Sequence, residues 1–247
     1  MDRADRLGTG AMGALPEHVK IYLSAPHECP YLPSETASSL IIDPNMSVDR
    51  DALTFFTVNG FRRSGDVIYR PHCAQCNACV SVRINVEEFR ANRSQKRTAR
   101  RNRDLRIVTG PARYDDVHFQ LYLRYQRSRH PDSEMCDPDP EQYRRFLVND
   151  RHETWFYEMY DRDELAAVAV CDRLNDGLSA IYTFFDPKHA DRSLGTYAII
   201  YQIEQARKLR LNFVYLGYWI AECRKMSYKT NFRPIQGLVN GTWQRIE

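Results

Sequence analysis

The sequence lacks an apolar run long enough to cross a membrane. Its longest apolar runs, such as Leu165 to Cys171, are far shorter than the roughly 20 residues that a membrane span needs. It also lacks an apolar stretch behind Arg3 and Arg6, so a secretory signal peptide is not expected. We therefore expect a cytoplasmic protein with no membrane partner.

Several catalytic signatures are missing as well. There is no phosphate-binding loop, no glycine-rich dinucleotide fingerprint and no serine-hydrolase elbow, which counts against nucleotide-dependent and hydrolytic chemistry. A large net charge is also missing, because 35 Lys and Arg residues oppose 32 Asp and Glu residues, for a formal charge of +3. With 43% hydrophobic residues among 247, the chain is neither fibrous nor wholly disordered, and it can form one large domain or two small ones.

The positive charge is nevertheless concentrated in one segment. Between Arg90 and Arg106, eight basic residues accompany one acidic residue, Asp104. Basic side chains that neutralise phosphates release counterions, so this segment favours contact with a nucleic-acid backbone over an ordinary solvated face, which mixes both signs. We expect Ser94 to cap a helix here, and no motif reads bases, so recognition should depend on shape and phosphates, with no DNA partner. The candidate contacts are Arg93, Lys96, Arg97, Arg100, Arg101 and Arg103.

Hydrophobic periodicity predicts an α+β fold. Apolar residues alternate from Val80 to Val86, which places Arg83 on the face away from the core. Three strands at 154–160, 165–171 and 178–185, separated by turn residues, predict an antiparallel meander. A helix with Leu209 among its inward residues and a strand at 213–216 should follow. Gly110-Pro111 marks a soft boundary, so we expect a smaller Cys- and Arg-rich α+β domain over 1–108 and a second domain over 109–247.

Cysteines form the sharpest local pattern. Cys73, Cys76 and Cys79 place three thiols within seven residues, and Cys29 is the natural candidate for a fourth ligand of zinc or an iron-sulfur cluster. An equally weighted alternative is that these are small buried side chains around a tight turn. We therefore expect no required cofactor and leave the metal open.

Two stretches combine aromatic rings with cations. They run over 60–71 and 215–229, each just after a predicted regular element, where binding groups are commonly mounted. Taken singly, each ring is more often part of a core. Together with their cations, which are Arg62, Arg63, Lys225 and Lys229, the two stretches predict a pocket for an anionic group.

These segments, in the same order, resemble the aminoacyl-tRNA:protein transferases, specifically the bacterial aspartate/glutamate leucyltransferases related to eukaryotic arginyltransferases. The matching stretches are Cys29 to Pro33, Asn59 to Gly65, Tyr69 to Cys79, Arg83-Ile84, Ser94 to Leu105, Phe185 to Pro187, Ser193 to Gly195 and Tyr215 to Pro234. They extend over most of the chain.

The resemblance implies a C-terminal domain like the GNAT acyltransferases. It implies transfer of leucine from leucyl-tRNA to the α-amine of proteins that begin with Asp or Glu, which creates a degradation signal in an N-degron pathway. Because an α-amine has a pKa of roughly 7.7 to 8.0 and the ester is already activated, positioning should dominate catalysis. Expected catalytic residues are Tyr218, Lys225, Tyr228 and Asp186, and expected substrate-binding residues are Arg62, Arg63, Arg83 and Lys229; the basic segment would bind the tRNA.

Three alternatives remain open at this point. Arginyl-tRNA is a second possible donor, since leucine follows only from the likeness to the bacterial branch. Where arginyl relatives carry a Cys-x-x-Cys pair, this chain has Cys29 followed by Pro, Tyr and Leu32, so their iron-sulfur chemistry does not carry over. A non-catalytic RNA-binding module would need no second aromatic cluster. An acetyl-CoA enzyme would have its glycine-rich loop reduced to Arg192 to Gly195, with a single glycine.

Overall fold

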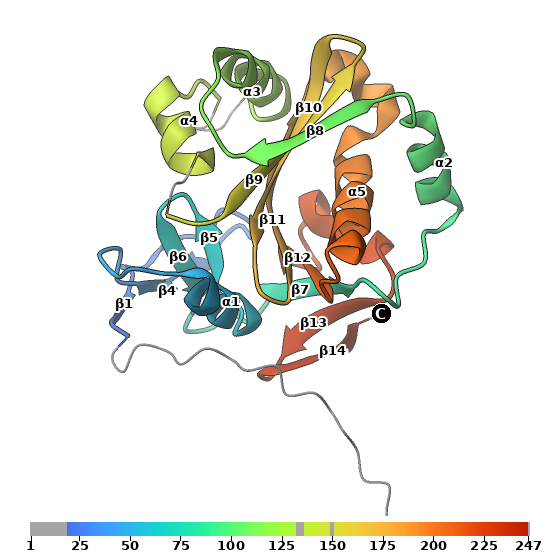
Figure 1. Ribbon diagram of the computed structural model, residues 1–247. Coiled ribbons are helices and arrows are strands. Elements are labelled where there is room, and N and C mark those ends of the chain that lie inside the picture. The colour runs from blue at the N-terminus through green and yellow to red at the C-terminus, as the bar shows by residue number, and fades with distance from the viewer. Residues whose placement is uncertain (1–18, 132–135, 149–150, 247) are drawn as a thin grey trace, which may run out of the picture.

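The computed structural model describes residues 19–131, 136–148 and 151–246, and the molecule mixes helices with sheets (Figure 1). The strands are β1 (Ile21–Leu23), β2 (His27–Glu28), β3 (Thr36–Ala37), β4 (Ser39–Ile42), β5 (Arg62–Ser64), β6 (Val67–Pro71), β7 (Val80–Asn85), β8 (Arg106–Pro111), β9 (Thr154–Asp161), β10 (Glu164–Arg173), β11 (Gly177–Phe185), β12 (Phe213–Trp219), β13 (Ile235–Val239) and β14 (Thr242–Ile246). The helices are α1 (Arg50–Val58), α2 (Arg93–Arg101), α3 (Asp116–Arg129), α4 (Pro140–Leu147) and α5 (Leu194–Lys208), with 3-10 segments η1 (Pro187–Arg192) and η2 (Arg224–Asn231).

An eight-stranded sheet forms the centre of the molecule, in the order β14-β13-β7-β12-β11-β10-β9-β8. A four-stranded sheet, β1-β4-β6-β5, lies beside it, and β2 pairs with β3. The antiparallel pairing of β9, β10 and β11 confirms the predicted meander, and β8 extends it at the edge.

The two halves of the chain share the large sheet. Strand β7 pairs with both β12 and β13, although it comes from the first half of the sequence. The boundary expected between residues 108 and 109 lies within β8. The division into two domains stays a prediction.

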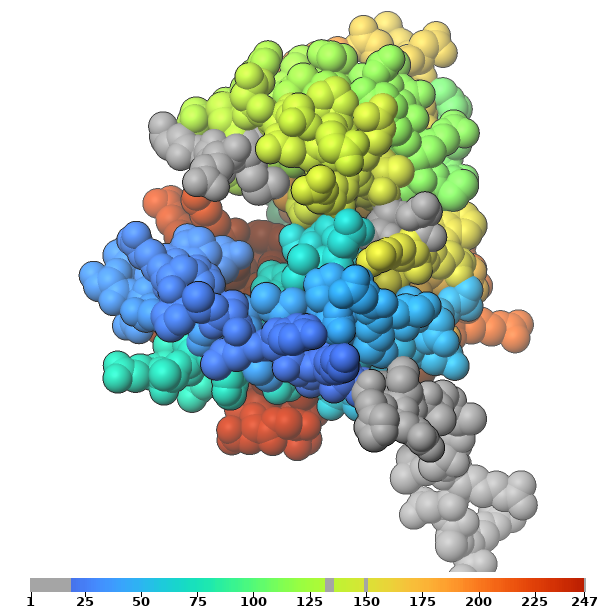
Figure 2. All heavy atoms as spheres, turned by 90° about the vertical axis from the view of Figure 1, so that its left-hand side faces the viewer, coloured from blue at the N-terminus to red at the C-terminus, as the bar shows by residue number. Residues whose placement is uncertain are grey.

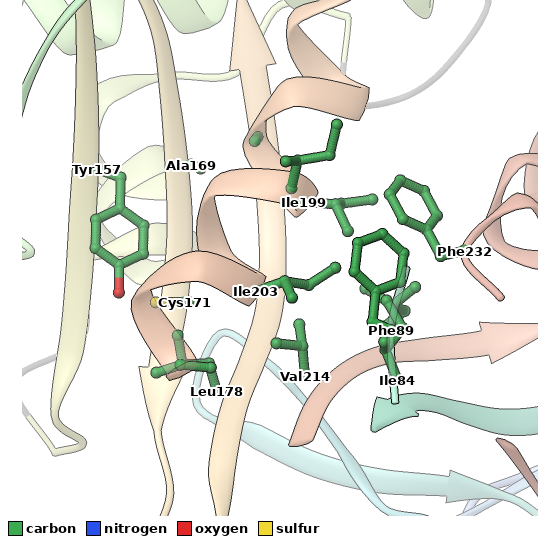
Figure 3. Packing of buried hydrophobic residues seen from close by; sticks show 14 of the residues in the cluster. Ile84, Phe89, Tyr157, Ala169, Cys171, Leu178, Ile199, Ile203, Val214 and Phe232 are labelled. Atoms are coloured by element: carbon green, nitrogen blue, oxygen red, sulfur yellow. The ribbon is translucent and has the colours of Figure 1, made fainter. Parts of the chain in front are cut away.

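Helix α5 packs across the large sheet and builds the main core. Ile199 and Ile203 point toward Phe89 and Phe232, as Figure 3 shows, and Ala198 and Ala206 are fully buried where the helix needs close contact. Leu209, expected to face inward, is 41% exposed because α5 ends at Lys208.

Two helices begin at side-chain caps, and the cap of α2 differs from the one expected. Helix α1 is capped by Asp49, whose side chain accepts from Ala52 N at 2.8 Å. Helix α2 is capped by Asn92 and not by Ser94, because Asn92 and Gln95 exchange hydrogen bonds as a capping box, which satisfies two free N–H groups at once. Within the described residues, no helix is both long enough and apolar enough to span a membrane.

The large sheet opens between β11 and β12. These neighbouring strands run parallel and pair at only three positions, from Gly177↔Phe213 to Ser179↔Tyr215. Gly177 is needed for this contact, because a Cβ there would lie 2.5 Å from the Phe213 carbonyl oxygen. From Ala180 onward β11 no longer pairs with β12, and β12 has a register shift between Tyr215 and Gly217 in its pairing with β7. This opening positions the candidate site.

Candidate active site

A pocket of about 680 Å³ lies where β11 and β12 separate. Figure 2 shows a hollow between the blue first-half residues and the green helical region, with red C-terminal atoms in its depth. The lining comes from the first half (Tyr31, Arg62, Tyr69), α3 and its end (Tyr125, Arg129, His130), β11 (Ala180, Ile181, Tyr182, Thr183, Phe185), the start of α5 (Ser193, Gly195, Thr196, Ile199), β12 (Leu216, Gly217, Tyr218) and η2 (Lys225, Met226, Tyr228, Lys229).

Arg62 sits as a wedge between the two separated strands. Its Nη1 donates to Ser179 Oγ at 2.9 Å, and its Nη2 donates to the Ala180 carbonyl oxygen at 2.6 Å, an acceptor that β12 leaves unpaired. Gly217, with φ of +78°, makes room, because a Cβ there would lie 2.9 Å from Arg62 Nε. The guanidinium therefore holds the opening apart and lines its floor.

Tyr218 and Lys229 form the buried wall beside Arg62. The Tyr218 hydroxyl lies 2.7 Å from the Gly60 carbonyl oxygen and 3.1 Å from that of Tyr69, so its proton is donated to backbone while its ring lines the pocket. The ammonium of Lys229 donates to the Tyr218 carbonyl oxygen. Burial, and then the positive charge of Arg62, lowers the pKa of Lys229 to about 7.

Cations also gather at the mouth of the pocket. Lys225 from η2 and Arg129 from the end of α3 are exposed, and His130, the residue after Arg129, also lines the pocket. Burial lowers the pKa of His130, and the charges of Lys225 and Arg129 lower it further. Tyr228, 45% exposed, adds a phenol to the same wall. Among the described residues that line the pocket, none is Asp or Glu.

Two of the expected substrate-binding arginines lie outside this pocket. Arg63 is buried in a two-point ion pair with Asp172, with distances of 2.6 Å and 2.8 Å, and Thr154 donates to the same carboxylate. Arg83 is held between Phe213 and Trp243, whose ring centres lie 3.6 Å and 4.3 Å from its guanidinium carbon. These partners assign both side chains to the architecture of the sheets.

Asp186 lies at the end of β11, next to the pocket but not among its lining residues. Its carboxylate accepts from Lys188 N at 3.1 Å and pairs with Arg124 at 3.2 Å. Asp186 thus stops the strand and orients the chain that leads into α5. Among the four expected catalytic residues, the structure brings Tyr218, Lys225 and Tyr228 together in the pocket.

Helix α2 presents the predicted basic surface. All six candidate side chains are exposed, and none of them forms a salt bridge within the described part of the chain. Arg101 donates to the Asp191 carbonyl oxygen, and the buried Asn102 donates to that of Arg192 at 2.9 Å. These hydrogen bonds therefore fix the end of α2 to the residues immediately before α5, and the first turn of α5 lines the pocket.

Three of the candidate cysteine ligands lie close enough to the fourth, Cys79, to act on it electrostatically. Burial, and then the thiols of Cys73, Cys29 and Cys76, raises the pKa of Cys79 to about 11. The described residues nevertheless contain no group of three or more His, Cys, Asp or Glu side chains arranged to hold a metal ion. The thiols do not fit a metal or cluster as they are arranged, and no chemical step is assigned to one.

Several pocket residues had no signal in the sequence. Arg129 and His130 lie at the end of α3, and Tyr125 and Tyr182 belong to α3 and β11, with no motif that marks them as site residues. Only their convergence at the pocket distinguishes them, with Tyr125 packed edge-on against Phe185 at 5.0 Å.

Known proteins match the chain over nearly its whole length. The family described as arginine-tRNA-protein transferase matches with its N terminus at residues 27–97 and its C terminus at 117–239. The aspartate/glutamate leucyltransferase of Hahella chejuensis is 50% identical over 225 residues, which cover 91% of this chain and 96% of the relative. That of Pseudomonas putida is 47% identical over the same shares of both chains. The chain belongs to this transferase family.

Membership in the transferase family makes the chain an aminoacyl-tRNA:protein transferase, as its motifs predicted, with the pocket as its candidate active site. Among solved structures, FemX resembles it with 8% sequence identity and a TM-score of 0.47, over 87% of this chain and 84% of FemX.

Proposed function

We propose that this protein transfers leucine from leucyl-tRNA to the α-amine of proteins that begin with Asp or Glu, and thereby marks them for degradation in the cytoplasm. The observation that carries the proposal is the lining of the pocket, which combines Arg62, Arg129, Lys225 and Lys229 with no carboxylate among its described residues. The name of the relatives, aspartate/glutamate leucyltransferase, agrees with it.

The mouth of the pocket suits an acidic N-terminal side chain. Lys225 and Arg129 approach from opposite elements and both act on His130, so an acceptor carboxylate between them would meet two cations. The same positive surroundings disfavour the charged form of the acceptor α-amine, which lowers its pKa and supplies the neutral nucleophile.

The lining also favours leucine over arginine as the donor. An arginyl side chain would bring another cation into a pocket that offers it no carboxylate. Ile181, Ile199, Leu216 and Met226 instead supply apolar surface for a leucyl side chain.

Transfer then requires a single displacement at the ester. The acceptor nitrogen attacks the carbonyl carbon, a C–N bond forms, and the C–O bond to the 3′ oxygen of the tRNA breaks. Tyr228 and Lys225 are positioned to donate to the developing oxyanion. Tyr218 acts through its ring and backbone carbonyl, and Asp186 shapes the approach to α5.

The opened sheet supports a GNAT-like fold for the second half, because in that fold the acyl donor enters where two parallel strands separate. Here the Arg62 guanidinium occupies the apex of the opening, which argues against acetyl-CoA as the donor. The exposed cations of α2 would bind tRNA phosphates. The hydrogen bond from Asn102 to the Arg192 carbonyl oxygen connects that surface to the start of α5.

The decisive experiment measures transfer of labelled leucine or arginine from charged tRNA to peptides that begin with Asp, Glu or Ala. We expect leucine on the Asp and Glu peptides alone. Arginine transfer to the same peptides would assign the other donor, and no transfer from either donor would contradict the proposal.

A matched pair of variants tests the acidic subsite. Arg129→Gln should reduce the preference for Asp over Ala peptides, because it removes one of the two mouth cations. Arg127→Gln changes an arginine on the same helix that pairs with Asp137 outside the pocket, and it should leave the preference unchanged. If Arg129→Gln and Arg127→Gln showed the same preference for Asp over Ala peptides, Arg129 would not belong to the acidic subsite.

A further inference from the structure

Lys229 is the most unusual cation of the pocket because it is buried without an anionic partner. Its side chain, on η2, belongs to a residue only 7% exposed, and its ammonium donates to the Tyr218 carbonyl oxygen. No salt bridge to Lys229 occurs among the described residues. A lysine kept only to bind an anion gains little from burial, because burial penalises its charge.

The groups around Lys229 reinforce that penalty. Arg62 approaches from β5, and the other basic residues that line the same pocket are Lys225, Arg129 and His130, whose own pKa is lowered. The other titratable groups nearby are the Cys223 thiol and the phenols of Tyr69, Tyr218 and Tyr228, and burial raises the pKa of each phenol. Lys229 is therefore an amine that can release its proton near neutral pH, which fits its low pKa.

Lys229 lies where the nitrogen of the attacking α-amine must lose a proton. Lys229 and Arg62 line the same wall at the opening between β11 and β12, where the ester is proposed to enter. The attacking α-amine must pass one proton to another group as its nitrogen bonds to the carbonyl carbon, and no carboxylate of the described lining can accept it.

We propose that neutral Lys229 accepts the proton of the attacking α-amine through Nζ and returns a proton to the departing 3′ oxygen of the tRNA. The step is balanced, because a C–N bond forms, a C–O bond breaks and the lysine ends in its starting protonation state. This inference rests on the proposed function, and it converts Lys229 from an expected substrate-binding residue into a catalytic one.

The first test observes Lys229 directly, without turnover. The chain has six lysines, so a protein labelled with ¹³C at the lysine ε-carbon gives few signals. We expect one signal to titrate near pH 7 and to be absent from Lys229→Arg. Lys208→Arg, at an exposed site on α5 outside the pocket, should retain it. Titration of every lysine above pH 9 would overturn the proposal.

The second test measures single-turnover leucine transfer to an Asp peptide between pH 6 and 9. Lys229→Arg keeps a long basic side chain that stays protonated over this range and cannot accept a proton, so its rate should fall by a factor on the order of 10² to 10⁴, with unchanged tRNA affinity. Trimethylamine, which accepts protons but cannot be acylated, should restore part of the rate to Lys229→Ala. A Lys229→Arg rate within a few-fold of wild type would show a binding role and reject proton transfer.

The two proposals fail differently. If wild-type protein transfers no leucine, the proposed function fails whatever Lys229 does. If wild type and Lys229→Arg both transfer leucine at similar rates, the proposed function stands and only the role of Lys229 is wrong.

Discussion

Arg62 and Arg63 are consecutive residues of β5 with opposite settings. Arg63 points into the interior, where its Nε and Nη2 donate to Asp172 and its side chain is 1% exposed. Arg62 points to the other side, into the opening between β11 and β12, where its partners are the Ser179 hydroxyl and the Ala180 carbonyl. One cation has a carboxylate partner and the other has none.

The difference separates architecture from function. A buried cation that is neutralised by a carboxylate joins two parts of a fold and has no capacity left for a ligand. A cation that is held by neutral oxygens, such as Arg62, keeps its positive field, and the buried amine of Lys229 beside it likewise has a carbonyl oxygen as its hydrogen-bond partner. Four basic side chains, with no carboxylate among the described lining residues, therefore mark the pocket more clearly than any single motif.

The largest expected effect concerns the interior arginine. Arg63→Met leaves Asp172 buried without its partner, which should lower the free energy of unfolding by about 3 to 5 kcal/mol. Urea denaturation measures this loss, and the transfer rate of the folded fraction should change little. A loss below about 1 kcal/mol would place Arg63 outside the architecture.

Arg62→Lys tests the other side of β5. Lysine cannot bridge Ser179 and Ala180 with a planar fork, so the opening should shift and transfer should fall by roughly 100-fold, with a smaller loss of stability than for Arg63→Met. Gly217→Ala should act in the same direction, because its Cβ would contact the guanidinium. If both variants transferred leucine at the wild-type rate, Arg62 would not be needed to hold β11 and β12 apart.

The basic side chains on α2 have no buried partner, so replacing them should change tRNA binding and leave the stability of the fold unchanged. Replacing Arg97 and Arg100 with Gln should weaken tRNA binding about tenfold and reduce the slope of log affinity against log salt by on the order of 0.7 to 0.9 for each phosphate that is no longer neutralised. Binding titrations at several salt concentrations measure both. An unchanged slope would exclude these side chains from the tRNA surface, and an altered unfolding free energy would show a structural role.

The pH dependence of stability separates Lys229 from both arginines. Its folded pKa of about 7 lies below the usual 10.5, so the folded state binds fewer protons than the unfolded state between these values. The free energy of unfolding should therefore rise with pH from 7 to 8.5, by at most about 1.4 kcal/mol per pH unit from this group. Lys229→Met should lose that rise. Equal slopes in urea denaturation of both proteins would contradict the low pKa.

Local structure could be predicted from the sequence where several local signals agreed. The meander at β9, β10 and β11 was predicted because alternation and turn residues agree over three strands. Caps were less predictable, since Ser94 and Asn92 both suit a helix start and the reciprocal bonds with Gln95 decide between them. The final segments β13 and β14 went unpredicted, because short strands next to a shared sheet have weak periodicity.

The sequence by itself determined the family, the basic character of α2 and the chemical types of residue at the site, because these depend on residue identity and order. Only the tertiary structure decided which cations share the pocket. Arg62, Arg63 and Arg83 look equivalent along the chain, but strand direction and the separation of β11 from β12 send Arg62 to the pocket, Arg63 to Asp172 and Arg83 to an aromatic cage. Charge acts through space, so its function depends on partners that lie more than a hundred residues away.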